Sequence, residues 1–424
     1  MLQINVLREE REKVITGLLK RNFNEASELV DKAIALDKSR REKQLKNDEL
    51  LAEANKLAKE IGNLMKSGKK EEAEGIKVKT AELKKASASL SAELENVEAE
   101  LKNILYLIPN VPHESVPAGK GADDNITVFE NGNLPTLSQE AVPHWDLIKK
   151  YDIIDFDLGN KISGAGFPVY KGKGARLQRA LINFFLDKAV AQGYLEIQPP
   201  IVVNEASGYG TGQLPDKEGQ MYHMQADNLY MIPTAEVPIT NLYRDVILTE
   251  QDLPIKNVGY TPCFRREAGS WGAHVRGLNR LHQFDKVEIV RISRPEDSYA
   301  TLDEMCNYVQ GLLEDLELPY RKLLLCGGDI GFNSALTYDM EVYAGAQKRW
   351  LEVSSISNFE AFQANRLKLR YRNKEGKTNL LHTLNGSALA LPRIVAAILE
   401  NNQTESGINI PKALWDYTGF KIIN

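Results

Sequence analysis

The first 108 residues contain no proline, and their apolar side chains recur at every third or fourth position. Proline breaks a helix interior, whereas this spacing places apolar side chains along one helical face. The rhythm occurs twice, from Leu29 to Leu64 and from Ile76 to Ile104, and Ser67-Gly68-Lys69-Lys70 between the two runs is a turn signal. The pattern predicts an antiparallel coiled-coil hairpin whose arms of roughly 30 to 36 residues extend about 45 to 54 Å.

A two-helix hairpin is too thin to form a globular core, so its function lies in what it contacts. One interpretation is a dimerisation rod or spacer. The other is an arm that lies along phosphates, because residues 56–85 hold nine Lys and five Glu, while residues 27–104 hold sixteen basic and sixteen acidic residues. Lys-rich faces are commonly only solvated, so charge alone leaves both interpretations open.

Composition excludes several classes of protein. Of 424 residues, 43% are hydrophobic and 26% are charged, which is typical of globular domains and not of disordered chains. No apolar run approaches the roughly 18 residues of a membrane span, and residues 1–10 lack the apolar core of a secretion signal. Three scattered cysteines exclude a disulfide framework and a Cys-x-x-Cys zinc site, so we expect a cytoplasmic protein without structural zinc.

A proline-rich linker marks a domain boundary. Prolines at 109, 112 and 117 end the helical pattern, which divides the chain into residues 1–108 and 109–424. Strand and helix patterns alternate in the second region, which predicts an α+β domain built on an antiparallel sheet. The predicted helices span residues 176–192, 295–316 and 392–401. The predicted strands span residues 193–203 (interrupted at Pro199-Pro200), 228–232, 273–284 continuing into 286–291, and 336–343.

Common nucleotide-binding signatures are absent from the sequence. There is no Gly-x4-Gly-Lys-Ser/Thr loop, and the glycines from Gly208 to Gly212 lack the spacing of a dinucleotide site, so we expect a flexible loop there.

The segment from Cys263 to Glu288 is more informative. It predicts two strands joined by a polar loop, with Arg265, Glu267, Phe284 and Glu288 at alternating positions that share one face. An arginine, a carboxylate and an aromatic ring on one sheet face would form a cradle for a charged planar ligand.

Several segments resemble a known family. Phe264-Arg265-Arg266-Glu267 resembles motif 2 of class II aminoacyl-tRNA synthetases, residues 193–203 resemble motif 1, and residues 384–393 resemble motif 3. Further segments are similar to seryl-tRNA synthetases in particular, in the same order along nearly the whole chain; they are residues 110–117, 210–215, 233–238, 282–288, 352–355 and 382–387. The chain is identified as a member of this family by resemblance.

The resemblance implies a fold and a reaction. The fold would be an N-terminal tRNA-binding domain (1–108) with a long coiled-coil arm, followed by a class II catalytic domain (109–424) whose antiparallel sheet is flanked by helices. Serine and ATP would form seryl-adenylate and pyrophosphate, and serine would pass to the terminal adenosine of tRNA(Ser), and of tRNA(Sec) where the host has one. The implied partners also include Mg²⁺ bound with ATP and a second copy in a homodimer formed through motif 1, with no membrane involved.

The resemblance also implies the roles of individual residues. Arg265 and Arg393 would be catalytic, Glu352 and Ser355 would bind Mg²⁺, and Phe284 and Arg393 would sandwich the adenine. The implied serine-binding residues are Thr234, Ala235, Glu236, Arg265, Glu288 and Ser387. The implied ATP-binding residues are Arg265, Arg266, Glu267, Leu281, Phe284, Glu352, Val353, Ser354, Ser355 and Arg393.

Three positions depart from the family pattern. Ala165-Gly166 stands where Ser-Arg is frequent, Asn365 replaces a common arginine, and Pro392 precedes Arg393, so the motif 3 helix either starts at this proline or is distorted there. Two other functions are alternatives: a relative that loads a carrier protein, which would lack the long arm, and a silent paralogue, which would lose Arg265, Glu352 or Arg393. The arm and these three residues are present. We expect deletion of residues 40–90 to abolish tRNA charging and to spare adenylate formation.

Overall fold

The computed structural model describes residues 1–216, 218–267 and 275–424. Contacts divide them into two compact units, one formed by residues 1–19 and 23–109 and the other by residues 20–22 and 110–424. Within the described ranges, no helix has both the length and the apolar character needed to cross a membrane.

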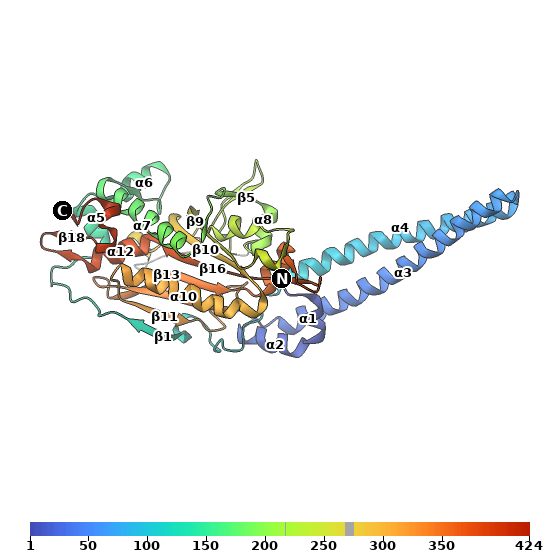
Figure 1. Cartoon of the computed structure of the whole chain (residues 1–424), viewed down its shortest axis with the longest axis horizontal. Helices are drawn as coiled ribbons and strands as arrows, with labels where there is room; N and C mark the ends of the chain where they lie inside the picture. The colour runs from blue at the N-terminus through green and yellow to red at the C-terminus, as the bar shows by residue number, and fades with distance from the viewer. Residues whose placement is uncertain (217, 268–274) are drawn as a thin grey trace. The chain divides into compact units, whose positions relative to one another are not determined.

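The first unit is the predicted helical hairpin. Its helices are α1 (Ile4–Glu9), α2 (Arg11–Lys20), α3 (Ala26–Lys66) and α4 (Lys70–Leu107), and the two long helices pack along each other (Figure 1). The chain reverses between α3 and α4 at Gly68, whose φ of 77° favours glycine. The predicted apolar positions are buried or half-buried on α3 and α4, which pack against each other, so the sequence pattern is confirmed.

One layer of that interface is polar. Ser87 Oγ donates to Asn47 Oδ1 at 2.7 Å, and Asn47 Nδ2 donates to Ser91 Oγ at 3.3 Å. Both Asn47 and Ser87 are buried, and a buried polar pair of this kind fixes the register of a coiled coil. Asn47 on α3 therefore lies opposite Ser87 on α4.

The second unit is built on an eight-stranded sheet in the order β1-β11-β12-β13-β16-β10-β9-β4. Neighbouring strands are antiparallel except for the parallel pair β4 and β9. The strands are β1 (Ile126–Asn131), β4 (Leu195–Glu196), β9 (Ile255–Phe264), β10 (Gln283–Ser293), β11 (Tyr320–Leu324), β12 (Leu336–Ala344), β13 (Arg349–Asn358) and β16 (His382–Ala390). The predicted antiparallel α+β architecture is confirmed.

Helices pack against this sheet and complete its core. The three long ones are α7 (Gly172–Ala191), α10 (Ser298–Asp315) and α12 (Leu391–Asn401), and Figure 1 shows α10 lying along the strands. Val287 and Ile289 of β10 belong to the apolar cluster that these helices complete. Side chains alternate along a strand, so Phe284, Lys286 and Glu288 face the other way.

Shorter elements surround the sheet. The helices are α5 (His144–Lys150), α6 (Phe156–Ile162), α8 (Glu205–Thr211), α9 (Glu236–Asn241), α11 (Ala361–Leu367) and α13 (Trp415–Thr418). The small sheets contain β2 (Ile154–Asp155), β3 (Val169–Tyr170), β5 (Val202–Asn204), β6 (His223–Met224), β7 (Leu229–Met231), β8 (Ile247–Thr249), β14 (Arg370–Arg372), β15 (Thr378–Leu380), β17 (Gln403–Thr404), β18 (Gly407–Asn409) and β19 (Ile422–Ile423).

Two predicted segments differ from the structure. The strand expected from Ala273 begins only at Gln283; residues 273 and 274 lie outside the described ranges, and a 3₁₀ turn, η4, occupies Gly277–Asn279. Residues 208–211 of the expected flexible loop at 208–212 instead belong to helix α8, and Gly212 follows its end in the left-handed region. A Cβ on Gly208 would lie 2.7 Å from the Leu214 side chain, so glycine serves close packing there and not flexibility.

Candidate active site

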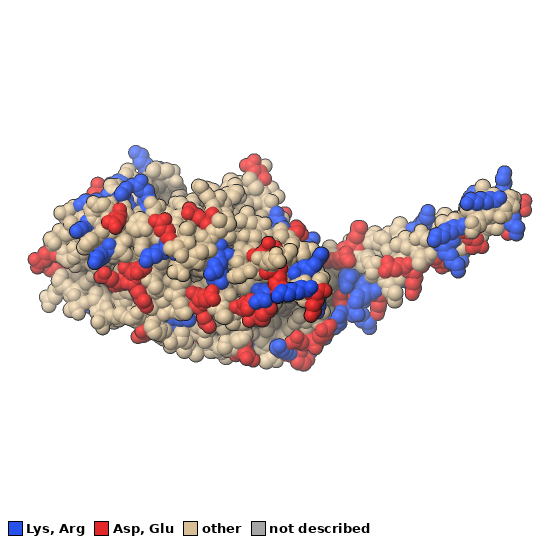
Figure 2. All heavy atoms as spheres, viewed as in Figure 1, with Lys and Arg blue, Asp and Glu red and all other residues tan. Residues whose placement is uncertain are grey.

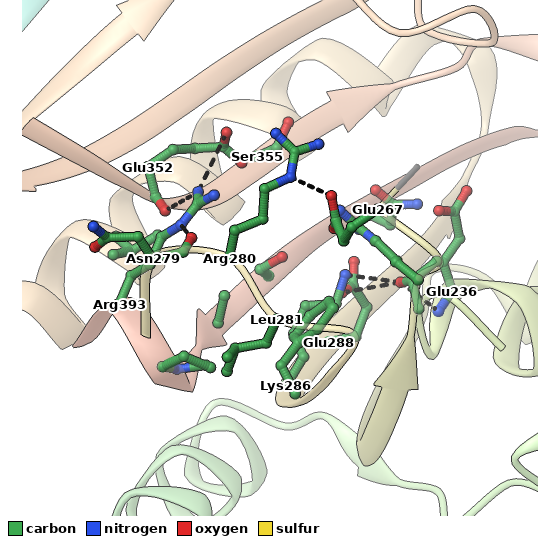
Figure 3. A pocket seen from close by; sticks show the side chains of 18 of the residues that line it. Glu236, Glu267, Asn279, Arg280, Leu281, Lys286, Glu288, Glu352, Ser355 and Arg393 are labelled. Carbon is green, nitrogen blue, oxygen red and sulfur yellow. Dashed lines mark hydrogen bonds and ion pairs between the residues drawn. The ribbon is translucent and has the colours of Figure 1, made fainter. Parts of the chain in front are cut away.

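A pocket of about 390 Å³ is lined by residues of β10, β13, β16 and α12 (Figure 3). It brings together most of the residues implied by the family resemblance. Those that line it are Thr234, Glu236, Arg265, Glu267, Leu281, Phe284, Glu288, Glu352, Val353, Ser355, Ser387 and Arg393. Residues from distant parts of the sequence therefore share one cavity.

One end of the pocket is a buried polar cluster. Lys286 Nζ lies 2.6 Å from Glu288 Oε2 and donates to Thr234 Oγ1 at 2.8 Å. Thr234 Oγ1 in turn donates to Glu288 Oε2 at 3.4 Å. Glu288 pairs across the strands with Ser387 of β16, which brings the Ser387 side chain to the same end.

Glu236 is a second buried carboxyl at this end. Its pKa is raised to about 7, mainly by burial and next by the neighbouring Glu288, while the amide of Gln363 and the charge of Lys286 partly oppose this rise. Gln363 Nε2 donates to Glu236 Oε1 at 2.6 Å, and Thr383 Oγ1 donates to Gln363 Oε1 at 2.7 Å. The Glu236 carboxyl is thus held in a fixed orientation, close to the midpoint of its titration at neutral pH.

The rest of the pocket carries arginines, together with the carboxylates of Glu267 and Glu352. The Arg265 guanidinium lies 5.3 Å from the centroid of the Phe284 ring, and its Nε donates to the Pro233 carbonyl at 3.4 Å. Arg393 donates from Nε to the Asn279 carbonyl at 3.0 Å and from Nη1 to the Glu352 carbonyl at 2.7 Å. The backbone therefore orients the Arg393 guanidinium on the pocket wall (Figure 3).

Strand geometry explains how Glu352 and Ser355 share the pocket. Residues three apart on a regular strand point to opposite faces. In β13 the register shifts, because Met340 pairs with Ser354 whereas Glu341 pairs with Glu352, so Val353 is an extra residue. This β-bulge brings two hard oxygen donors to one face. In the described part of the chain, no group of three or more His, Cys, Asp or Glu could hold a metal ion.

Three of the predicted site residues do not line the cavity. Ala235 is fully buried at the start of α9. Ser354 is buried, and its Oγ donates to the Ser387 carbonyl at 2.6 Å. Arg266 is exposed, and its backbone N–H donates to the Gln220 carbonyl at 2.9 Å.

Arg265 and Glu267 reach the pocket from a loop and not from a strand. The sequence predicts that both alternate along one strand, but β9 ends at Phe264, and Glu267 has a φ of 48°. Glu267 instead forms an ion pair with Arg280 from the other side of the loop.

Sequence reasoning missed several residues of the site. Lys286, Asn279, Arg280 and Asn385 line the cavity. Lys286 could have been found, because it lies between Phe284 and Glu288 at the same period of two. No local pattern marks the others.

The departures at Gly166 and Pro392 have structural explanations. Gly166 has a φ of 81°, and a Cβ there would lie 2.3 Å from the His282 ring, so a side chain would displace that ring. Helix α12 begins at Leu391, with Pro392 in its first turn, where the missing N–H has no cost. The first of the two expectations for Pro392 is therefore the correct one. The structure gives no consequence for Asn365.

Comparisons with known proteins agree with this geometry. Residues 1–112 match the family model described as the seryl-tRNA synthetase N-terminal domain, and residues 221–402 match the tRNA synthetase class II core domain (G, H, P, S and T). The serine–tRNA ligase of Salinibacter ruber is 50% identical, covering 99% of this chain and 98% of its own, and that of Prosthecochloris aestuarii is 46% identical, covering 100% and 99%.

A solved structure is similar as well. The seryl-tRNA synthetase of Pyrococcus horikoshii complexed with ATP superposes with a TM-score of 0.93 at 36% identity, covering 100% of this chain and 99% of that one. The two family models, the two relatives with about half of their residues identical to this chain, and the matching solved structure all agree. The chain belongs to the seryl-tRNA synthetase family.

Proposed function

We propose that the pocket between β10, β13 and α12 is where serine and ATP react. The enzyme is a serine–tRNA ligase, which activates serine with ATP to seryl-adenylate and then transfers serine to tRNA(Ser). The observation that carries the assignment is the polarity of the cavity: the buried carboxyls of Glu236 and Glu288 lie at one end and Arg393 at the other (Figure 3), and Arg265 also lines the cavity. The carboxyls are complementary to the ammonium group of an amino acid, and the arginines are complementary to the triphosphate of ATP.

The carboxyl end would bind serine. Glu236 and Thr234 would take the ammonium group, and Glu288 and Ser387 would bind the hydroxyl. These side chains are buried, so an amino acid without a hydroxyl would leave polar groups unpaired. Discrimination on this basis reaches about 10⁴-fold, which supports strong rejection of alanine.

The arginines would serve the chemical step. A carboxylate oxygen of serine attacks the α-phosphorus of ATP, an O–P bond forms, and the bond to pyrophosphate breaks. The nucleophile is already ionised, so catalysis depends on in-line placement and on neutralising charge at phosphorus. Arg265 would bridge the serine carboxylate and the α-phosphate, and Arg393 would reach the γ-phosphate.

The adenine end would be built from Phe284, Arg393 and the backbone near Leu281, with Glu267 beside it. Glu352 and Ser355 would hold Mg²⁺, and their two oxygens on one face suit an ion that keeps most of its ligands as phosphates and water. When bound, Mg²⁺ supplies positive charge to the phosphates of ATP.

The remaining assignments rest on the family. We propose that residues 1–108 bind tRNA through the α3–α4 arm and that residues 109–424 carry out catalysis. Basic side chains lie along the distal half of the arm (Figure 2), which supports contact with phosphates. The proposal also includes a homodimer formed through motif 1 and a cytoplasmic location. It further includes charging of tRNA(Sec) where the host has this tRNA.

ATP–pyrophosphate exchange without tRNA tests the assignment of the pocket. Wild-type enzyme should exchange with serine and not with alanine, glycine or threonine, and Glu288→Gln should lose serine-dependent exchange. Alanine supporting exchange as well as serine does would contradict the assigned hydroxyl site.

A further inference from the structure

Arg393 depends on a turn that lies outside the residues assigned to substrates. Its Nε donates to the carbonyl of Asn279, the last residue of the 3₁₀ turn η4. Leu278 and Asn279 of this turn, and Arg280 and Leu281 after it, also line the pocket. The position of η4 therefore helps to set the orientation of Arg393, whose Nη1 is also held by the Glu352 carbonyl, and it shapes the adenine end of the pocket.

His144 of α5 fixes η4 from behind. The Leu278 backbone N–H donates to His144 Nε2 at 2.9 Å, so Nε2 is an acceptor and the ring proton lies on Nδ1. Gly277 packs on the same ring: its φ is 65°, and a Cβ there would lie 2.4 Å from Nε2. The turn η4 therefore packs directly against the His144 imidazole.

Glu400 in turn holds His144. Both side chains are fully buried, and Glu400 Oε1 accepts from His144 Nδ1 at 2.8 Å and from its backbone N–H at 3.0 Å. Glu400 Oε2 accepts from the backbone N–H groups of Ala346 and Gln347, each at 3.1 Å. Burial would raise the pKa of Glu400, but the hydrogen bonds from His144 and Gln347 lower it below its ordinary value, so the carboxylate stays charged.

Gln347 closes the network. Its Nε2 donates to Glu400 Oε1 at 2.8 Å, and its Oε1 accepts from Asn279 Nδ2 at 2.8 Å. Glu400 and Arg393 lie seven residues apart on α12, about two helical turns, and hence on the same side of that helix. Helix α12 therefore carries both Arg393 and Glu400, the carboxylate that holds His144 and, through it, the turn η4 to which Arg393 donates.

We propose that His144 and Glu400 are positioning residues for the ATP subsite, acting through η4 on Arg393. This inference rests on the proposed function of the pocket. Neither side chain lines the cavity, so their effect on ATP is indirect. The serine end is built on other elements, around Glu236 and Lys286, and should not depend on this network.

The test separates the KM for ATP from the KM for serine in pyrophosphate exchange. His144→Asn keeps an amide donor for Glu400 but removes the Nε2 acceptor. We expect the KM for ATP to rise roughly tenfold, the scale of one lost buried hydrogen bond, with the KM for serine changed less than about twofold. The rise in Tm on adding ATP should shrink in parallel, which gives a readout independent of turnover.

Ile148→Ala is the matched control, because Ile148 is buried on the same helix α5 and its apolar side chain forms none of the hydrogen bonds of this network. It should lower Tm and leave both KM values unchanged. If His144→Asn does not fold, Gly277→Ala takes its place, since its Cβ pushes η4 off the ring while the His144–Glu400 pair stays intact.

An unchanged KM for ATP, or an equal rise in both KM values, would overturn the inference. Serine-dependent exchange by the wild type would still support the assignment of the pocket, so the two failures are distinguishable.

Discussion

Lys286 and Glu288 form an ion pair with 2.6 Å between Nζ and Oε2, and their side chains are only 7% and 3% exposed. A second carboxyl, Glu236, is buried beside them, and Thr234 Oγ1 accepts from Lys286. Two acids and one fixed cation therefore share this end of the pocket. A substrate ammonium group would supply the second positive charge.

Replacing Lys286 should disable serine use selectively. In Lys286→Met, Glu288 loses its buried counter-charge next to another acid, and breaking such a pair costs about 3–5 kcal/mol, part of it in folding stability. We expect kcat/KM for serine in pyrophosphate exchange to fall by roughly 10²-fold or more, with the KM for ATP within about twofold of wild type.

The double variant Lys286→Met with Glu288→Gln is the control for this experiment. It removes both charges, so Tm should recover while serine use remains lost. A rise in the KM for ATP as large as that for serine would contradict a local role for Lys286.

Glu236 should give serine activation a pH dependence near neutrality. Its pKa of about 7 means that the charged form dominates only above that pH. A charged carboxylate binds an ammonium group better, so kcat/KM for serine should rise from pH 5.5 through 7 and then level off. Glu236→Gln should flatten this rise and lower activity at pH 8.

The same shift predicts how pH changes stability. The folded-state pKa of Glu236 lies above its unfolded value of about 4.5, so the stabilising contribution is present at low pH and is lost as the pH rises through 7. The serine ammonium group should offset that loss. Serine should therefore raise Tm more at pH 8 than at pH 5.5, and an equal rise at both would contradict the assigned contact.

Local patterns predicted the helices well, because the three- to four-residue spacing of apolar side chains can be recognised within a short stretch of sequence. The runs from Leu29 to Leu64 and from Ile76 to Ile104 occupy the α3–α4 interface, including the polar position Asn47. The helix from Leu391 also follows from sequence, since a proline in the first turn is compatible with its geometry.

Tertiary packing accounts for what the sequence could not predict. The glycines near Gly208 resemble a loop in the sequence, yet Gly208 and Gly210 lie within α8, where neighbouring side chains leave no room for a Cβ. Glu352 and Ser355 share a face only because of the bulge at Val353, which alternation alone cannot show. Their joint role came from family resemblance. His144 and Glu400 lie far apart in sequence, and no motif links them.

Arg393→Lys should separate charge from geometry. Arg393 donates to two backbone carbonyls, on Asn279 and Glu352, through two different nitrogens. Lysine keeps the charge but has a single nitrogen, so it cannot hold both bonds and also reach a phosphate. We expect kcat for exchange to fall roughly 10²-fold with the KM for serine little changed, whereas near-normal kcat would show that charge alone suffices.

The arm should be needed for tRNA and not for activation. Removing residues 48–86 and closing the gap with a short glycine-serine turn keeps the Asn47–Ser87 hydrogen bond as the last layer of the hairpin. This version of the 40–90 deletion preserves helix register. Aminoacylation of tRNA should be lost while pyrophosphate exchange stays within about twofold, and equal loss of both activities would contradict the division of labour.

Charge on the arm can be tested without shortening it. Lys56 and Lys59 are exposed on the distal half of α3, and Lys38 and Lys46 are exposed on its proximal half. If the distal half lies along phosphates, Lys56→Ala with Lys59→Ala should raise the KM for tRNA roughly tenfold at moderate salt and reduce its salt dependence by about two phosphate contacts. The proximal pair of substitutions removes the same charge from the same helix and should have less effect. A contact between the distal half and phosphates depends on where the lysines lie. Equal effects of the two pairs would therefore contradict it and would mean that only the net charge of the arm matters.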